Sequence, residues 1–246
     1  MGSDPISRST RNGVRPHFLA KGAGPQVDTG AGEKSPALFL EASKSMPEFR
    51  NHSYAAFLFD MDGTVLDSSA AVDRVWGSWA KRHGIDAATL LATVHGVRSE
   101  DTIRRFAGTT VDIAKETLWI LEAEVRDVDG VVALAGIHAF IEALDPGTWA
   151  IVTSAPRALA EVRLRAAKLP LPQVMITAED VQRGKPDPQG FLLGAQRLGV
   201  RIDECLVFED SPAGVAAAKA AGADVAIVGG LVPKTEGTFA LANYRA

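Results

Sequence analysis

Cysteine is almost absent from this 246-residue chain: Cys205 is the only one, so no disulfide can form within the chain. That fits a reducing compartment, and we expect a cytoplasmic protein. Basic residues are not in excess, since the formal net charge is −4, and without a basic field no nucleic-acid partner is expected. Long apolar runs are also missing. None approaches the roughly 20 residues that span a bilayer, so no membrane anchor is predicted.

The first 51 residues contain few apolar side chains, and these show neither helical nor strand periodicity. Glycine, serine, proline and basic residues dominate, which predicts a disordered leader over residues 1–51. Phe18-Leu19-Ala20 is too short for the core of a secretory signal. An organelle transit peptide, which Arg8, Arg11 and Arg15 would suit, stays open beside a translated linker.

The rest of the chain is organised around residues 55–67, AAFLFDMDGTVLD. Five apolar residues lead into Asp60, Asp62 follows, and Gly63 permits a sharp turn. Such a run predicts a strand buried in a parallel sheet, with Asp60 at the carboxyl end where open α/β sheets bind ligands. We interpret Asp60 as a nucleophile for phosphorus and Asp62 as the acid/base that protonates the leaving oxygen. The alternative is a pair of solvated turn aspartates.

Helical periodicity follows this stretch, with Val72, Val75, Trp76 and Trp79 at spacings of three and four. Further helices are predicted over residues 87–93, 99–107 and 110–126. We expect residues 69–130 to form a separate helical cap, inserted after the nucleophile loop as a hinged cover would be. The core domain would then comprise residues 52–68 and 131–246.

Strands and helices alternate from residue 131 to the end of the chain. This alternation predicts an α/β, Rossmann-like fold: a parallel sheet with helices on both faces, five strands, and the nucleophile strand near its centre. The other strands are predicted over residues 149–153, 174–176, 205–208 and 225–228, and the helices over 134–144, 157–167, 188–198 and 212–221.

Two more segments carry polar groups beside predicted elements. Ser154 and Ala155 follow a strand, and a hydroxyl with nearby N–H groups at a helix start forms a cradle for phosphate oxygens. An ordinary N-cap serine is the alternative. Lys185 stands between Gly184 and Pro186, a restricted position for a surface lysine, although a surface loop stays open.

Paired acids, Glu209 and Asp210, end the strand predicted over residues 205–208. Carboxylate oxygens are the ligands that Mg²⁺ prefers, which makes this pair a candidate metal site. Alternatively, Asp210 only favours the positive end of the following helix.

These segments together carry a family resemblance. Residues 60–68, DMDGTVLDS, resemble the first motif of the haloacid dehalogenase superfamily in the form found in its phosphatases and phosphomutases. Ser154, Lys185 and Glu209-Asp210 match the second, third and fourth motifs, and the resemblance covers about residues 54–232. It implies that Ser154 binds the transferring phosphoryl group and that Lys185 neutralises charge. It also implies that Asp210 binds metal directly, with Glu209 in support.

The charge of this predicted site requires a cation. Asp60, Glu209, Asp210 and a phosphate dianion would be opposed only by Lys185, so the cluster would repel its own substrate without a bridging divalent ion. We therefore predict magnesium dependence, with Asp60, Asp210 and the Asp62 backbone carbonyl as ligands.

Residues 95–98, HGVR, lie between two predicted cap helices and resemble a segment of small sugar-phosphate and glycerol-phosphate phosphatases. His95 and Arg98 are therefore predicted to bind substrate, with the Arg98 fork gripping phosphate or hydroxyls. The alternative is that both only pair with acids such as Glu100 and Asp101. The cap tryptophans are expected in the cap core rather than as sugar platforms.

The sequence thus predicts a magnesium-dependent phosphatase for a small phosphorylated sugar, sugar alcohol or glycerol, acting as a monomer or weak homo-oligomer. A β-phosphoglucomutase-like phosphomutase is the alternative. Such mutases resemble one another in a hinge histidine, whose position here corresponds to Val72. A catalytically silent scaffold on the same fold would be expected to lack a motif acid, and none is missing.

Overall fold

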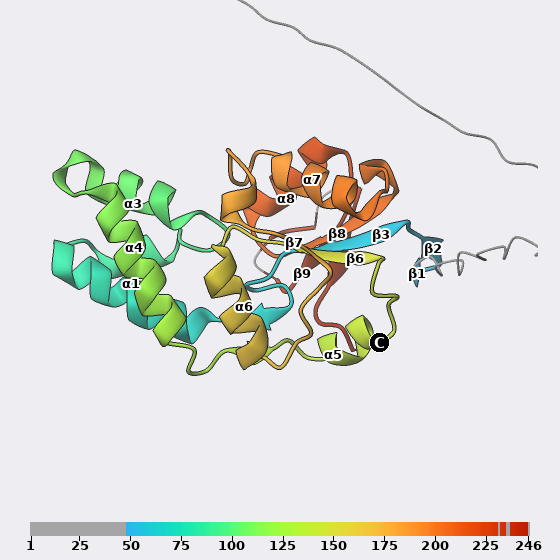
Figure 1. Ribbon diagram of the computed structural model, residues 1–246, viewed down its shortest axis with the longest axis horizontal. Coiled ribbons are helices and arrows are strands. Elements are labelled where there is room, and N and C mark those ends of the chain that lie inside the picture. Colours follow the sequence, from blue (N-terminus) through green and yellow to red (C-terminus); the bar gives the residue numbers. More distant parts are fainter. Residues whose placement is uncertain (1–47, 231, 235–236, 246) are drawn as a thin grey trace, which may run out of the picture. The chain divides into compact units, whose positions relative to one another are not determined.

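The computed structural model describes residues 48–230, 232–234 and 237–245. Its centre is a six-stranded sheet in the order β10-β9-β8-β3-β6-β7, in which every neighbouring pair is parallel (Figure 1). The strands are β3 (Ala56–Phe59), β6 (Trp149–Val152), β7 (Val174–Ile176), β8 (Cys205–Glu209), β9 (Asp224–Val228) and β10 (Thr238–Leu241). The predicted α/β fold with a parallel sheet is confirmed, and the strand before Asp60 lies inside the sheet.

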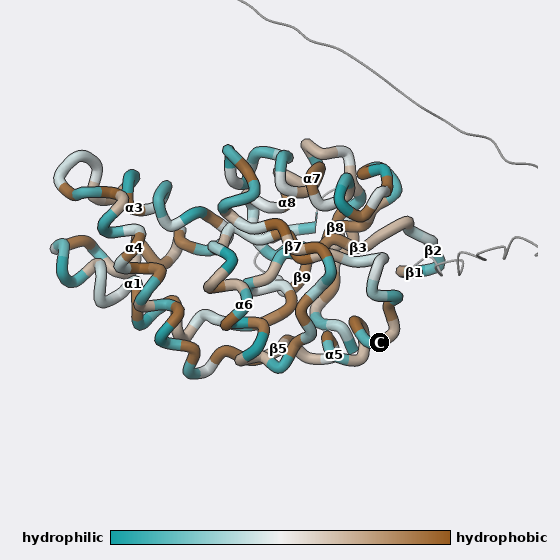
Figure 2. The backbone as a smooth tube through the Cα atoms, viewed as in Figure 1, coloured by the Kyte–Doolittle hydropathy of each residue, from teal (hydrophilic) through white to brown (hydrophobic). Residues whose placement is uncertain are grey.

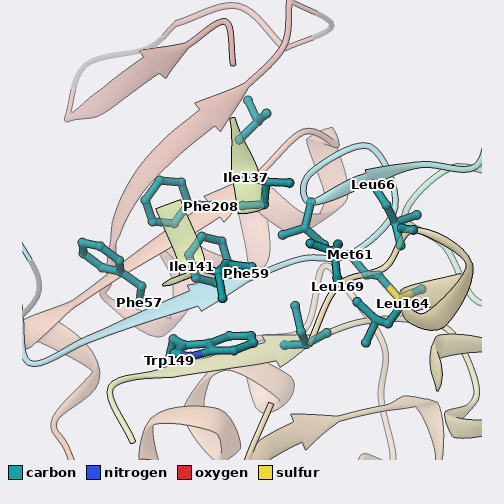
Figure 3. Packing of buried hydrophobic residues seen from close by; sticks show 14 of the residues in the cluster. Phe57, Phe59, Met61, Leu66, Ile137, Ile141, Trp149, Leu164, Leu169 and Phe208 are labelled. Atoms are coloured by element: carbon teal, nitrogen blue, oxygen red, sulfur yellow. The ribbon is translucent and has the colours of Figure 1, made fainter. Parts of the chain in front are cut away.

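Alternate residues of β3 enter two different cores, because successive side chains of a strand point to opposite faces. Phe57 and Phe59 pack with α5 (Ile137–Glu142) and α6 (Arg157–Ala166) on one face. Leu58 packs with α7 (Gln189–Leu198) and α8 (Pro212–Ala221) on the other. Figure 3 shows the first core, and Figure 2 shows the hydrophobic stretches gathered along the strands. Burial on both faces explains the uninterrupted apolar run, and it fixes the backbone that carries Asp60.

The cap, residues 69–130, is helical as predicted, and it has a hydrophobic core of its own. Its helices are α1 (Ser69–His83), α2 (Ala87–Leu91), α3 (Ser99–Ala107) and α4 (Ile113–Arg126), with a 3₁₀ turn η1 (Gly108–Thr110) before α4. Trp76 and Trp79 are buried in this core, and Trp119 is partly buried beneath the Arg82 guanidinium at 4.1 Å. That the cap forms a separate domain stays a prediction.

The two chain crossings between sheet and cap lie side by side. β4 (Leu66–Asp67) leaves the core and pairs antiparallel with β5 (Val132–Ala133), which returns to it. Leu134 N also donates to Val65 O at 3.0 Å. This short ladder ties the turn after Asp60 to the segment that brings the chain back from the cap.

The structure differs from the sequence prediction in several elements: α4 begins at Ile113 rather than residue 110, and α2 ends at Leu91 rather than residue 93. The sheet has six strands rather than five, because β10 was not predicted. Helix α5 begins at Ile137 rather than residue 134, after Gly136 in a left-handed conformation (φ 88°). Residues 48–51, predicted as the end of the leader, belong to a hairpin of β1 (Glu48–Phe49) and β2 (His52–Ser53). The remainder of the predicted leader lies outside the described residues.

Within the part of the chain that the structure describes, no helix combines the length and the apolar character needed to cross a bilayer.

Candidate active site

Three acids and one lysine meet at the carboxyl ends of β3 and β8. Carboxylate oxygens of Asp60, Glu209 and Asp210 all lie within 4.8 Å of one another, and all three residues are buried. The Lys185 ammonium forms an ion pair with Asp60 and donates to Glu209 Oε1 at 2.7 Å. Residues 125 positions apart in sequence therefore form one charged cluster.

Burial of this cluster disfavours the ionised form of its acids. It raises the pKa of Asp60 well above the ordinary value, with Lys185 acting against the shift and Glu209 and Asp210 adding to it. Burial and the neighbouring Glu209 raise the pKa of Asp210 to about 7. For Lys185, burial lowers the pKa, but attraction to Asp60 and Glu209 outweighs it, and the net pKa is raised. The lysine is thus firmly cationic, and one positive charge faces three acids.

The turn after Asp60 is shaped to bring Asp210 close. Gly63 has φ 81°, and a Cβ on it would lie 2.0 Å from Asp210 Oδ2, so no side chain fits there. Thr64 Oγ1 donates to Asp210 Oδ1 at 3.2 Å. The glycine and threonine of the first motif therefore adjoin the acid of the fourth.

Glu209 is held from several sides. It accepts from Lys185 Nζ, from the Ser211 backbone N–H at 2.7 Å and from Ser211 Oγ at 3.0 Å. A Cβ on Gly214 of α8 would lie 1.5 Å from Glu209 Oε1, so only glycine leaves room for the carboxylate. Glu209 is thus engaged by protein donors, whereas Asp210 keeps its Oδ2 oxygen toward Gly63.

This donor set fits a magnesium ion. The ion prefers oxygen ligands and is usually held by one or two carboxylates, with the remaining positions filled by water and substrate phosphate. Asp60 and Asp210 supply those carboxylates, and the excess of buried negative charge favours a cation between them.

Asp62 lies apart from this cluster. Its Oδ1 accepts from Ser68 Oγ at 2.6 Å and from Arg163 Nη1 at 3.0 Å, and its side chain is 21% exposed. Asp60 and Asp62 line the same cavity. The two motif aspartates therefore have different surroundings: one is buried beside a lysine, and the other is oriented by a guanidinium at the cavity wall.

Ser154 and Ala155 lie after β6, as expected, and both line the cavity. Ser154 Oγ donates to Gly96 O at 3.0 Å. The Ala155 N–H donates to Thr153 Oγ1 at 3.0 Å. Phosphate binding by these two residues stays a prediction, whereas the N-cap alternative for Ser154 is wrong, since the N-cap residue of α6 is Pro156.

The loop of residues 95–98 brings the cap against the core. His95 is exposed and lines the cavity with Asp60 and Asp62. Gly96, at φ 73°, passes so close to Ser211 that an added Cβ would lie 2.5 Å from its Oγ. His95 is therefore placed where substrate contact was expected.

Arg98 joins the cap to the core, and its predicted contact with substrate stays a prediction. Its guanidinium donates to the backbone oxygens of Ala178 (3.1 Å), Val181 (2.8 Å) and Gln182 (3.2 Å), in the segment before Lys185. A Cβ on Gly184 would lie 2.8 Å from Arg98 Nε. Arg98 forms no ion pair with Glu100 or Asp101 among the described contacts, and it lines a second pocket together with Ser154 and Lys185.

The sequence interpretation missed two charged residues of the cavity wall, Arg163 and Glu124. Arg163 Nη2 donates to Glu124 Oε1 at 3.1 Å, and both side chains are buried. An arginine in the α6 segment and a glutamate in the α4 segment carry no local signal, because each is buried only once the two helices pack together.

The family model for haloacid dehalogenase-like hydrolases matches residues 54–222. Hexitol phosphatase A of Escherichia coli is 46% identical over 176 residues, covering 70% of this chain and 82% of that protein. Glycerol-1-phosphate phosphohydrolase 1 of Saccharomyces cerevisiae is 36% identical over 186 residues, covering 69% and 72%.

Among solved structures, a hydrolase from Pseudomonas syringae aligns with a TM-score of 0.64 and 27% identity, covering 71% of this chain and 84% of that one. The residues that the family model matches include β3, β6, β7 and β8 of the sheet, the cap and all the site segments described above. This chain belongs to the haloacid dehalogenase-like hydrolase family.

Proposed function

We propose that this protein is a magnesium-dependent phosphatase that releases inorganic phosphate from a small phosphorylated sugar, sugar alcohol or glycerol. The observation that carries the proposal is the buried meeting of Asp60 with Lys185, Glu209 and Asp210 beside a cavity that Asp62 also lines. The names of the relatives, a hexitol phosphatase and a glycerol-1-phosphate phosphohydrolase, support the substrate class.

Asp60 is the proposed nucleophile. One of its carboxylate oxygens attacks phosphorus, the bond from phosphorus to the ester oxygen breaks, and an aspartyl-phosphate forms on Asp60. Lys185 balances the charge that collects on the attacking oxygen and the phosphoryl group. Asp62 gives its proton to the departing ester oxygen, so the product leaves as a neutral alcohol.

In hydrolysis of the aspartyl-phosphate each aspartate reverses its role: Asp62 acts as a base and Asp60 is the leaving group. Asp62, now ionised, takes a proton from a water that attacks phosphorus, and the bond to the Asp60 oxygen breaks. Phosphate departs and both side chains return to their first states. Asp60, Asp210 and the Asp62 backbone carbonyl would hold Mg²⁺, which when bound would screen the charge between carboxylates and phosphate.

A phosphate-release screen tests this proposal. We expect turnover of at least one member of a panel of hexitol, hexose, deoxyhexose, pentose and glycerol phosphates, dependent on added Mg²⁺. Asp60→Asn keeps the shape but removes the nucleophile, and should lower kcat by more than about 10³-fold. Asp73→Asn, an exposed aspartate on α1, is the matched control and should retain wild-type rates. Undiminished activity in Asp60→Asn, or after exhaustive chelation, would contradict the mechanism.

A further inference from the structure

A buried chain of charges runs from the site into the cap. Arg163 of α6 donates through Nη1 to Asp62 Oδ1 at 3.0 Å and through Nη2 to Glu124 Oε1 of α4 at 3.1 Å. The Arg163 and Glu124 side chains are only 4% and 5% exposed. The guanidinium thus bridges the acid of the first motif and a carboxylate of the cap.

The bridge acts on one oxygen of Asp62. Both Ser68 Oγ and Arg163 Nη1 donate to Oδ1, and no described residue donates to Oδ2. Two donors fix the plane of the carboxyl group and occupy one oxygen, so Oδ2 is the oxygen left to exchange a proton with an ester in the cavity. Proton transfer depends on such placement, because the acid must lie within hydrogen-bond reach of the reacting oxygen.

A structural role alone is the simpler interpretation, since buried ion pairs also occur far from active sites. Two observations favour more than that. All three members of the bridge line the cavity that Asp60 also lines. The guanidinium also joins the proposed acid to the cap, so that the orientation of Asp62 depends on α4 packing against α6.

We propose that Arg163 is a positioning residue for Asp62, and that Glu124 holds Arg163 in place only while the cap lies against the core. Acid/base catalysis would thereby be coupled to docking of the cap. This inference rests on the proposed phosphatase function. It does not require either Arg163 or Glu124 to contact the substrate.

Leaving-group dependence provides the test. An alkyl phosphate such as glycerol 1-phosphate needs a proton on its departing oxygen, whereas the aryl ester p-nitrophenyl phosphate has a leaving group that is stable without one. Arg163→Met should therefore lower kcat about 10²-fold for the alkyl ester but less than about 3-fold for the aryl ester, with little change in KM. Arg163→Lys, which keeps one cationic donor, should recover part of the alkyl-ester rate.

Glu124→Leu should change the alkyl-to-aryl ratio of kcat in the same direction as Arg163→Met, and by less. Arg165→Met is the matched control, because Arg165 lies two residues further along α6, is 60% exposed and pairs only with Glu161 among the described residues. Its ratio should equal that of the wild type.

A single variant that leaves a buried charge unpaired can fail to fold. The double variant Arg163→Met/Glu124→Leu removes both buried charges of the α4–α6 pair, and thermal melting shows that each protein assayed is folded. Its alkyl-to-aryl ratio should stay low.

Equal losses on both esters, or no loss on either, in folded Arg163 variants would overturn the positioning role. An unchanged ratio in Glu124→Leu would overturn the coupling to the cap. The alkyl ester assayed is a member of the substrate panel that the wild type hydrolyses; if the wild type hydrolysed no member of that panel, the proposed function itself would fail, and that outcome is distinct from the other two.

Discussion

Asp210 is 7% exposed, and burial together with the charge of Glu209 raises its pKa from 3.8 to about 7. A carboxyl whose folded pKa exceeds its unfolded pKa binds its proton more tightly in the folded state. This group therefore stabilises the metal-free protein below about pH 4, and the contribution is lost as the pH rises toward 7. The difference is on the order of 4 kcal/mol at most.

We expect the metal-free protein to melt at a lower temperature at pH 7 than at pH 5, and Asp210→Asn to flatten this dependence. Because metal binding needs ionised carboxylates, Mg²⁺ should raise the melting temperature more at pH 8 than at pH 5. Thermal melting with and without Mg²⁺ measures both effects. Asp73→Asn should behave as the wild type. An Mg²⁺ shift that did not depend on pH would contradict the role of Asp210 as a ligand.

The residues of the site differ in how well the local sequence pattern predicts them. Asp60, Lys185 and Asp210 stand beside Gly or Pro or at the end of an apolar run, and each such position has a local pattern. Arg163 stands next to Leu164 in an amphipathic helix, where an arginine normally points to solvent. Its burial comes from α4, more than thirty residues away in sequence, and a local pattern contains no information about that contact.

Elements were predictable where periodicity was strong. α3, β7 and α8 have the predicted bounds. β10 is a four-residue edge strand paired only with β9, and it was missed because its short apolar run, Phe239 to Leu241, does not by itself distinguish a strand from other structure. The predicted start of α5 was early because residues 132–134 pair with the outgoing chain, a contact between segments about 66 residues apart.

The loop between α2 and α3 has a structural role that the sequence interpretation did not include. Arg98 joins this loop to the segment before Lys185 through three backbone oxygens. Arg98→Met should therefore lower stability by about 1–3 kcal/mol, since the partly buried hydrogen bonds to Ala178 O and Val181 O lose their charged donor. It should also lower kcat/KM by the same factor, about 10-fold, for every substrate, because one shared loop is displaced.

Measurement of kcat/KM for hexitol and glycerol phosphates checks this expectation. Arg104→Met on α3, an exposed arginine paired with Glu100, is the control and should leave both values unchanged. A loss confined to one substrate would indicate that Arg98 contacts the hydroxyls of that substrate, one of the two contacts that the sequence interpretation allowed.

At the scale of the whole molecule, the cavity lies where the cap meets the carboxyl ends of the strands, so residues from both parts decide what happens to the phosphoryl group. Trp76, His95 and Glu124 come from the cap, and Asp60 and Ser154 from the core. Sequence alone indicated that a cap follows the nucleophile loop, but not which of its side chains reach the site.

Val72 of α1 also lines this cavity, and it is the position that the sequence analysis matched to the hinge histidine of the phosphomutases. A valine neither holds nor moves a proton, so in the proposed mechanism Asp62 would activate water in the second step, and α1 would supply no second base to direct a sugar hydroxyl. We therefore expect glucose 1-phosphate, if turned over, to yield inorganic phosphate and glucose, followed by ³¹P NMR. Asp60→Asn should yield neither product, which ties both to the aspartyl-phosphate. Formation of glucose 6-phosphate without phosphate release would mean that the enzyme transfers its phosphoryl group to a sugar hydroxyl. It would also mean that the cap keeps water away from the aspartyl-phosphate, although Val72 provides no base for that hydroxyl.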